Sequence, residues 1–170
     1  SALTNDEAFV GEAMCVNTSC TTLRIAGNNL GEAGICAMTQ ALEQNKTLAY
    51  LDVGSNRLGK GGCTTLCSAL AKLGSRSGLR MLDISNNNVG AEGTQAIVAL
   101  IRSSRTLEKL HLGRNGLGAV GAKRLGAAML GIDPATQSMR SLHLAHNGLG
   151  VPGTRALVEA LSAGAHITDL

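Results

Sequence analysis

The sequence predicts an α/β solenoid built from repeated strand–turn–helix units, and three observations support this fold class. Five segments fit one pattern, LxxLxLxxNxLG, in which Cys, Met, Ile or Val can replace Leu. The asparagines of this pattern are 28, 31, 28 and 32 residues apart. Apolar residues then follow each segment at the four-residue spacing of one helix face. A fixed period of roughly 20 to 50 residues is typical of repeat architectures.

The first half of each pattern predicts a short strand. The five segments begin at Cys20, Leu48, Leu79, Leu107 and Met139. Their apolar positions alternate with polar ones, as in a strand that is buried on one face. One such unit cannot bury its own apolar face, so neighbouring units are expected to stack into a continuous core. In the second unit we expect the inward residues to be Leu48, Leu51, Val53 and Leu58.

The turn after the strand needs a separate test, because the fourth unit reads GLGAVG from Gly116 to Gly121. This stretch fits the GxGxxG turn of dinucleotide-binding proteins. The equivalent residues elsewhere read NLGEAG, RLGKGG, NVGAEG and GLGVPG, so only LGxxG is common to all units. We therefore expect a structural turn, in which Gly118 adopts a positive backbone dihedral and Gly121 permits close approach of stacked units. No nucleotide is expected.

The second half of each unit predicts a helix of about three turns. Apolar residues stand four and eight positions beyond the last glycine of LGxxG. In the second unit these are Leu66 and Leu70, which should cover the strand. Two units are longer, with insertions near Ser75 and Pro134 on the same edge of the solenoid. We expect tolerated surface variation there, with ligand-binding loops as the alternative.

The domain organisation expected from this pattern is a single solenoid over residues 1–170, with about five full repeats. Residues 1–19 align with the helical half of an upstream repeat, and residues 167–170 with the start of a sixth strand. Solenoids usually end in polar capping repeats, and neither end of this sequence has one. We expect an excerpt from a longer array, with end-to-end association as the alternative.

Composition narrows the class of partner. The chain has one Phe, one Tyr and no Trp, so the core must be aliphatic. Fifteen Lys and Arg against twelve Asp and Glu give a net charge of +3, and the basic residues are scattered along the sequence, which suggests neither a nucleic-acid nor a membrane partner. The sequence has no apolar run of roughly 18 residues and no secretion signal. Its five cysteines form no CxxC pair, which favours free, buried thiols in the cytoplasm.

These motifs resemble the leucine-rich repeat family, specifically its ribonuclease-inhibitor-like class with units of 28 residues or more, and the resemblance covers essentially the whole chain. It implies a curved horseshoe with a parallel sheet on the concave face and helices on the convex face. It also implies that partner proteins bind the concave face. In this family the motif asparagine hydrogen-bonds backbone groups that the turn leaves unpaired. The corresponding residues here are Asn28, Asn56, Asn87, Asn115 and Asn147.

The candidate partner-binding residues flank the inward leucines on the sheet. Strands of a sheet lie roughly 4.8 Å apart, so equivalent side chains of successive units approach contact distance. The candidates are Arg24, Tyr50, Asp52, Met81, Asp83, Lys109, His111 and His143. A merely solvated polar face is the main alternative. A divalent-metal site at Asp83, His111 and His143 is the weaker one, because side chains on parallel neighbouring strands point the same way rather than converging.

The function expected from these features is a non-catalytic protein-interaction module without a cofactor or resident metal. Ser, Cys and His are present, but no nucleophile and base share a recognisable motif. Two alternatives stay open. One is a regulator of a small GTPase, similar to the activators of the Ran GTPase that share this repeat class. The other is the sensor region of a larger multidomain receptor, similar to nucleotide-binding immune receptors.

Overall fold

The computed structural model describes residues 16–130 and 138–170, and within them strands and helices alternate along the chain. The strands are β1 (Thr22–Arg24), β2 (Tyr50–Asp52), β3 (Met81–Asp83), β4 (Lys109–His111) and β5 (Ser141–His143). The helices are α2 (Gly31–Gln44), α3 (Gly59–Leu73), α4 (Gly90–Ser103), α5 (Gly118–Leu130) and α6 (Gly150–Ser162). A 3₁₀ turn, η1 (Gly74–Arg76), follows α3.

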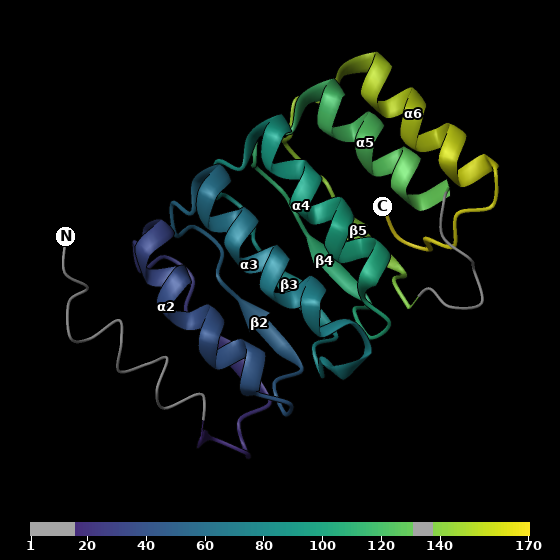
Figure 1. Cartoon of the computed structure of the whole chain (residues 1–170). Coiled ribbons are helices and arrows are strands. Elements are labelled where there is room, and N and C mark those ends of the chain that lie inside the picture. The colour runs from purple at the N-terminus through teal and green to yellow at the C-terminus, as the bar shows by residue number, and fades with distance from the viewer. Residues whose placement is uncertain (1–15, 131–137) are drawn as a thin grey trace.

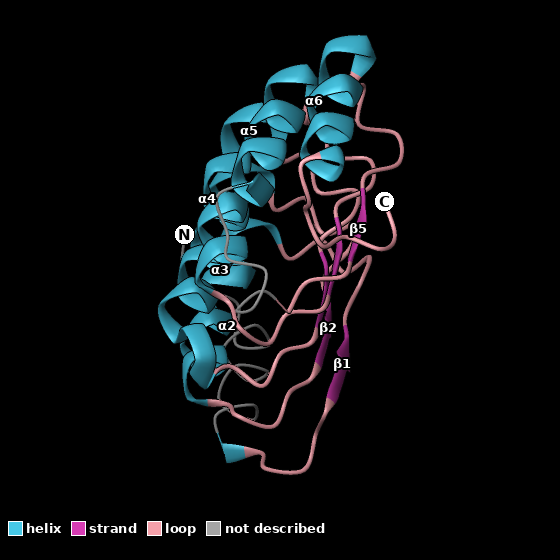
Figure 2. Cartoon of the chain, turned by 90° about the vertical axis from the view of Figure 1, so that its right-hand side faces the viewer, coloured by secondary structure: helices cyan, strands magenta, loops and turns pink. Residues whose placement is uncertain are grey.

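The strands form one parallel sheet in the order β1-β2-β3-β4-β5. Each helix packs on the helices of the neighbouring units, so the molecule has one layer of helices and one layer of strands (Figure 1). Viewed from the side, the sheet lines one face and the helices the other (Figure 2). This is the predicted α/β leucine-rich repeat solenoid.

The register of the sheet follows the sequence period. Leu51 pairs with Leu82, Leu82 with Leu110, and Leu110 with Leu142. Equivalent positions of successive units are therefore direct neighbours in space, although about 30 residues separate them in the chain. Side chains at equivalent positions of successive units are therefore brought close to one another on each surface of the molecule.

The core is the predicted aliphatic stack. Leu51, Val53 and Leu66 are completely buried, and Leu58 and Leu70 are nearly so. The helices are longer than expected, at 13 to 15 residues or about four turns. They are longer because each begins at the glycine of LG, so the LGxxG segment belongs to the helix instead of preceding it.

The turn glycines have the structural role that the repeat comparison predicted. Gly118 has a φ of +60°, and the LG glycines of the other units also lie in the left-handed region. Gly121 packs tightly against the preceding helix, since a Cβ atom there would lie 2.9 Å from Thr94 Oγ1. The GLGAVG segment therefore connects a strand to a helix and stacks two units together.

A second close approach joins α5 to α6 at Gly126, which the repeat pattern did not single out. A Cβ atom at this position would lie 2.8 Å from the carbonyl oxygen of Ala156. Because the obstacle is backbone, the two helices must separate to admit a methyl group.

We expect Gly126→Ala to lower the free energy of unfolding by about 1 to 3 kcal/mol, the usual cost of overpacking. Urea unfolding measures this change. Gly116→Ala is the control, since φ is +66° there but nothing lies within 4 Å of the added atom, so only backbone strain of about 1 kcal/mol is expected. A Gly126→Ala protein as stable as the wild type would show that α5 and α6 can move apart at no cost.

In two helix-to-strand connections a polar side chain accepts backbone N–H groups of the connection. The motif pattern did not include this repeated residue. Asn45 Oδ1 accepts the N–H groups of Thr47 and Leu48, at 3.0 and 2.8 Å. Ser104 Oγ accepts the N–H of Leu107 at 3.1 Å in the same way. The signal in the sequence is Asn or Ser three positions before the first apolar residue of the repeat.

The cysteines agree only partly with the expectation of buried thiols. Cys63 and Cys67 are buried, with their sulfur atoms 3.9 Å apart. The hydrogen bond to Cys63, followed by burial, raises the pKa of Cys67 well above its ordinary value. Cys20 is only half-buried and Cys36 is exposed, so the expectation is wrong for Cys36, which lies on the outer side of α2.

Both ends of the solenoid bear on the expected domain organisation. Most of the predicted upstream helix at 1–19, and the insertion near Pro134, lie outside the described residues. The other insertion forms η1 at the end of α3. At the C-terminus, Asp169 forms a single parallel bridge with Ser141 where a sixth strand was expected to start. Among the described residues, no helix has the length and apolar character needed to cross a membrane.

Candidate functional site

The predicted partner-binding residues lie together on the exposed face of the sheet, and we call this set the concave stripe. The parallel register places Asp52 beside Asp83 and His111 beside both Asp83 and His143. The same register aligns Tyr50 with Met81 and Met81 with Lys109. The members of the concave stripe are Arg24, Tyr50, Asp52, Met81, Asp83, Lys109, His111 and His143.

The C-terminal half of the concave stripe is a linked series of acids and imidazoles. His111 Nδ1 lies 3.3 Å from Asp83 Oδ2. The rings of His111 and His143 meet edge to face, with centroids 4.3 Å apart. His143 Nε2 in turn lies 3.1 Å from Asp169 Oδ2. These side chains are oriented by one another, so the surface they present is partly preorganised.

The N-terminal half contains an arginine stacked on an aromatic ring. The guanidinium carbon of Arg24 lies 4.9 Å from the centre of the Tyr50 ring. A cation over a ring face gains about 0.5 to 1 kcal/mol at exposed sites. One face of Tyr50 is therefore covered within the chain, which leaves its edge and hydroxyl for a partner.

Asp52 and Asp83 have a local structural role besides their charge. Asp52 Oδ1 accepts the N–H of Gly54 at 2.9 Å, and Asp83 Oδ1 accepts that of Ser85 at 2.8 Å. Each carboxylate thus supports the chain as it leaves its strand. Substituting these two residues would change both the charge and the turn, so they are poor choices for separating binding from stability.

Asp83, His111 and His143, the residues of the metal alternative, lie in a row across three neighbouring strands. Asp83 and His143 lie on opposite sides of His111, in strands that run parallel. Within residues 16–130 and 138–170, no group of three or more His, Cys, Asp or Glu side chains converges closely enough to hold a metal ion. The imidazoles contact carboxylates and each other instead.

Asp169 belongs to this surface, although it was not among the candidate binding residues. It lies beside Ser141 and accepts a hydrogen bond from Ser141 Oγ at 2.9 Å, besides its contact with His143. Ser141 itself is only 5% exposed. The register accounts for Asp169 lying beside Ser141, but the diagonal reach of its side chain to His143 depends on the rotamer.

The motif asparagines form a continuous buried series along the turn edge of the sheet. Asn87 Oδ1 accepts the backbone N–H groups of Asn56 and Leu58, at 2.9 and 3.2 Å. Its Nδ2 donates to the carbonyl oxygens of Val53, Ile84 and Ser85. Each amide therefore joins its own turn to the turn of the preceding unit.

The first motif asparagine differs from the others. Asn56, Asn87, Asn115 and Asn147 are at most 2% exposed. Asn28 is exposed, and its Nδ2 donates only to the carbonyls of Ile25 and Ala26 in its own turn. The structure describes no earlier strand against which Asn28 packs, so its amide links no second turn.

A family model described as "Leucine Rich repeat" matches residues 44–67, 79–98, 103–126 and 136–158, together more than half of the chain. The repeated strand–turn–helix unit and the buried asparagines agree with this match. The chain therefore belongs to the leucine-rich repeat family, and its similarity to a ribonuclease inhibitor places it with the ribonuclease-inhibitor-like repeats.

Relatives include proteins of different kinds. The chain is 32% identical over 106 residues to a Tonsoku-like protein of Bos taurus, covering 62% of this chain and 8% of that protein. It is 30% identical over 132 residues to a ribonuclease inhibitor of Sus scrofa, covering 61% and 28%. It is 32% identical over 107 residues to a human NACHT, LRR and PYD domains-containing protein 3, covering 62% and 10%. The chain thus matches only a minor part of each.

Two solved structures share the fold over nearly their whole length. The leiomodin-1 actin-binding site 2 superposes with a TM-score of 0.67 at 14% identity, covering 95% of this chain and 91% of that one. The tropomodulin C-terminal domain of Caenorhabditis elegans gives a TM-score of 0.68 at 13% identity, covering 94% and 93%. At such identities the likeness concerns the fold alone.

Proposed function

We propose that this chain is a non-catalytic module that binds a partner protein through the concave stripe. The observation that carries the proposal is the alignment of side chains of differing chemistry on one open sheet face, where the core does not require them. Partner specificity commonly comes from such a mixture of charged, polar and apolar groups.

The chemistry of the stripe suggests how a partner would be held. Asp52 is half-buried and lies beside Arg24 in the register, and within the described residues it forms no ion pair. Met81, also half-buried, lies on the neighbouring strand beside Tyr50 and supplies an adaptable apolar surface on the same face. A basic group of the partner, placed beside an apolar one, would complement these two side chains.

The relatives and structural neighbours support binding as the general role. One structural neighbour is titled an actin-binding site, and one relative is named an inhibitor of ribonuclease. The partners of those proteins are not assumed for this chain. We expect it to act in the cytoplasm, as its free cysteines favour.

The test removes side chains that hydrogen-bond no backbone in the described structure. We expect the triple variant Tyr50→Ala, Met81→Ala, Lys109→Ala to fold normally and to lose, by about tenfold or more, the proteins that the wild-type chain captures from cells of its source. A tenfold loss corresponds to roughly 1.4 kcal/mol of binding free energy, which the removal of one good anchor residue can cause. Quantitative mass spectrometry of the captured proteins measures it.

The matched control carries three substitutions on the convex helices, Gln95→Ala, Val120→Ala and Lys123→Ala, all at exposed positions. This variant should retain the same proteins as the wild type. The proposal fails if no captured protein distinguishes the two variants, or if the convex variant loses the partner instead.

The two alternatives predict different results. A regulator of a small GTPase would accelerate GTP hydrolysis when added to GTP-loaded Ran or a related GTPase, which a simple binding module would not do. The sensor alternative gains support from the similarity to a protein whose name includes NACHT and PYD domains. It predicts that the complete source protein carries such domains beside the repeats.

A further inference from the structure

Basic side chains gather along the edge of the solenoid where the helices end and the strands begin. Along the linear chain these residues are scattered, as predicted from the sequence. In the folded molecule several of them come together, because residues one period apart become neighbours. The set, which we call the basic edge, consists of exposed residues on the helix ends and the following connections: Lys46, Lys72, Arg76, Arg80, Arg102, Arg105 and Arg140.

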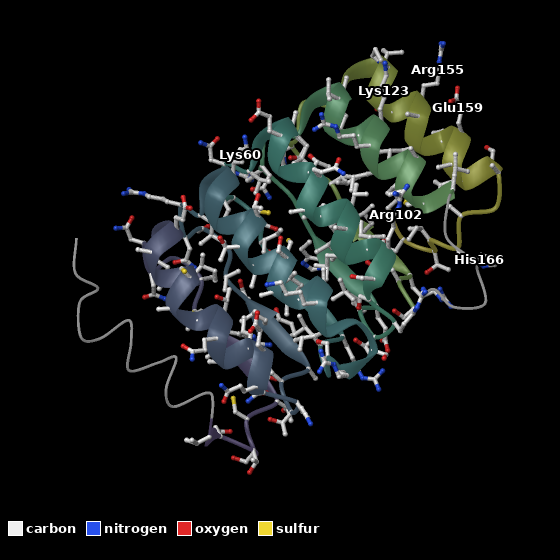
Figure 3. All side chains as sticks on the ribbon, in the orientation of Figure 1. Lys60, Arg102, Lys123, Arg155, Glu159 and His166 are labelled. Carbon is white, nitrogen blue, oxygen red and sulfur yellow. The ribbon has the colours of Figure 1, made fainter. Side chains whose placement is uncertain are left out.

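Backbone contacts show that these connections are stacked on one another. Gly78 packs against the carbonyl of Lys46, with a Cβ position 2.6 Å from that oxygen. The N–H of Arg80 donates to the backbone carbonyl of Ala49 at 2.8 Å, and the N–H of Arg140 donates to the backbone carbonyl of Glu108 at 2.9 Å. Figure 3 labels one member of this set, Arg102, which extends from the end of α4.

Helix-end electrostatics explain only part of this charge. A cation in the last turn of a helix stabilises it, and Lys72 and Arg102 occupy such positions in α3 and α4. Lys46, Arg76 and Arg80 lie outside the α-helices, and α2, α5 and α6 have no basic residue in their last turns. The basic edge therefore carries more positive charge than the helix ends require.

Few described acids lie near the basic edge. In the part of the chain that the structure describes they are Glu43, Glu108, Glu159 towards the end of α6, and Asp169, whose N–H donates to the carbonyl of Arg140. Glu108 pairs with Arg80. Arg105 and Arg140 have contacts of their own. The other four cations, Lys46, Lys72, Arg76 and Arg102, form no ion pair with any described carboxylate, so they are available to an external anion.

We propose that the basic edge binds an acidic segment of a partner protein, rich in Asp and Glu. Guanidinium groups bind carboxylates in a bidentate manner, and the stacked connections would present such groups to successive acidic residues of an extended segment. Single-stranded nucleic acid is less suited, because its binding relies on aromatic stacking, and Tyr50, the one aromatic residue that the structure describes, lies on the concave stripe. This inference does not depend on the concave stripe.

The test uses a fluorescein-labelled peptide of about twelve glutamates, with an all-glutamine peptide as its uncharged counterpart, followed by anisotropy at low salt. The wild-type chain should bind the acidic peptide and not the neutral one. The variant Lys46→Glu, Arg76→Glu, Arg102→Glu should raise Kd by about tenfold or more. The matched control Arg57→Glu, Lys123→Glu, Arg155→Glu has the same change in net charge at exposed positions elsewhere and should change Kd by less than about twofold.

Two further arms keep the proposal falsifiable. If the charge-reversed variant is poorly folded, Lys46→Gln, Arg76→Gln, Arg102→Gln should still weaken peptide binding, while the thermal midpoint falls only slightly through the loss of the Arg102 charge at the end of α4. A duplex DNA probe distinguishes the competing partner. The proposal is overturned if DNA binds more tightly than the peptide through the same residues, if the acidic peptide does not bind, or if the control variant weakens binding equally.

Discussion

Asn87→Ala lowers the free energy of unfolding by about 3 kcal/mol or more. The substitution leaves two backbone N–H donors, of the buried residues Asn56 and Leu58, without their amide acceptor. It also removes the donor to three carbonyl groups. An unsatisfied buried group costs about 1 to 3 kcal/mol, so the sum exceeds the cost of a typical substitution. Urea unfolding followed by circular dichroism measures the change.

Asn28→Ala is the matched control for this prediction. It removes the same side chain from the same position of the repeat, but at an exposed turn where the amide joins no preceding unit. We expect a loss below about 1 kcal/mol. Equal losses for the two variants would show that the bonds between units contribute nothing and that the asparagine matters only within its own turn.

Leu110→Ala should also destabilise the chain by about 3 to 4 kcal/mol, because rigid surroundings lie toward the upper end of the 2 to 5 kcal/mol that such core changes cost. Leu110 is completely buried in β4, between Leu82 of β3 and Leu142 of β5. Truncating its side chain leaves a cavity that the neighbouring units cannot fill without breaking the sheet register. Thermal and urea unfolding both report this loss.

Leu23→Ala is the corresponding control in β1. Leu23 occupies the same position of its repeat but is only half-buried, at the beginning of the described sheet. We expect the free energy of unfolding to fall by about 1 to 2 kcal/mol, since water can partly replace the lost side chain. A loss at Leu110 no greater than the loss at Leu23 would contradict the view that the central units carry the stability of the solenoid.

The period of the sequence was sufficient to predict most of the fold. Five copies of one motif determine which residues are buried, because each unit must use the same positions to pack on its neighbours. The period alone therefore places Leu51, Leu82 and Leu110 side by side, and the rows of the concave stripe follow from the same register. The helix starts were misjudged, because LGxxG looks like a connection although it forms the first helical turn.

Pairing within the surface could not be predicted in the same way. The register places His143 one strand beyond His111, but it does not say that Asp169 reaches His143, nor that Arg24 covers Tyr50. Such contacts depend on side-chain rotamers and on the twist between strands, which vary between units with equal motifs. Whether the concave stripe binds a partner stays a prediction.

The sequence by itself, with the family resemblance that it carries, therefore determined the repeat, the parallel order of the strands, the buried leucines and asparagines, and the residues of the concave stripe. Only the tertiary structure decided which side chains of the concave stripe contact one another. It also brought separate arginines and lysines together in the basic edge. The physical reason is that, in a solenoid, residues one period apart in the sequence lie next to each other in the folded molecule. Charge that is dilute along the chain becomes concentrated across the stacked units.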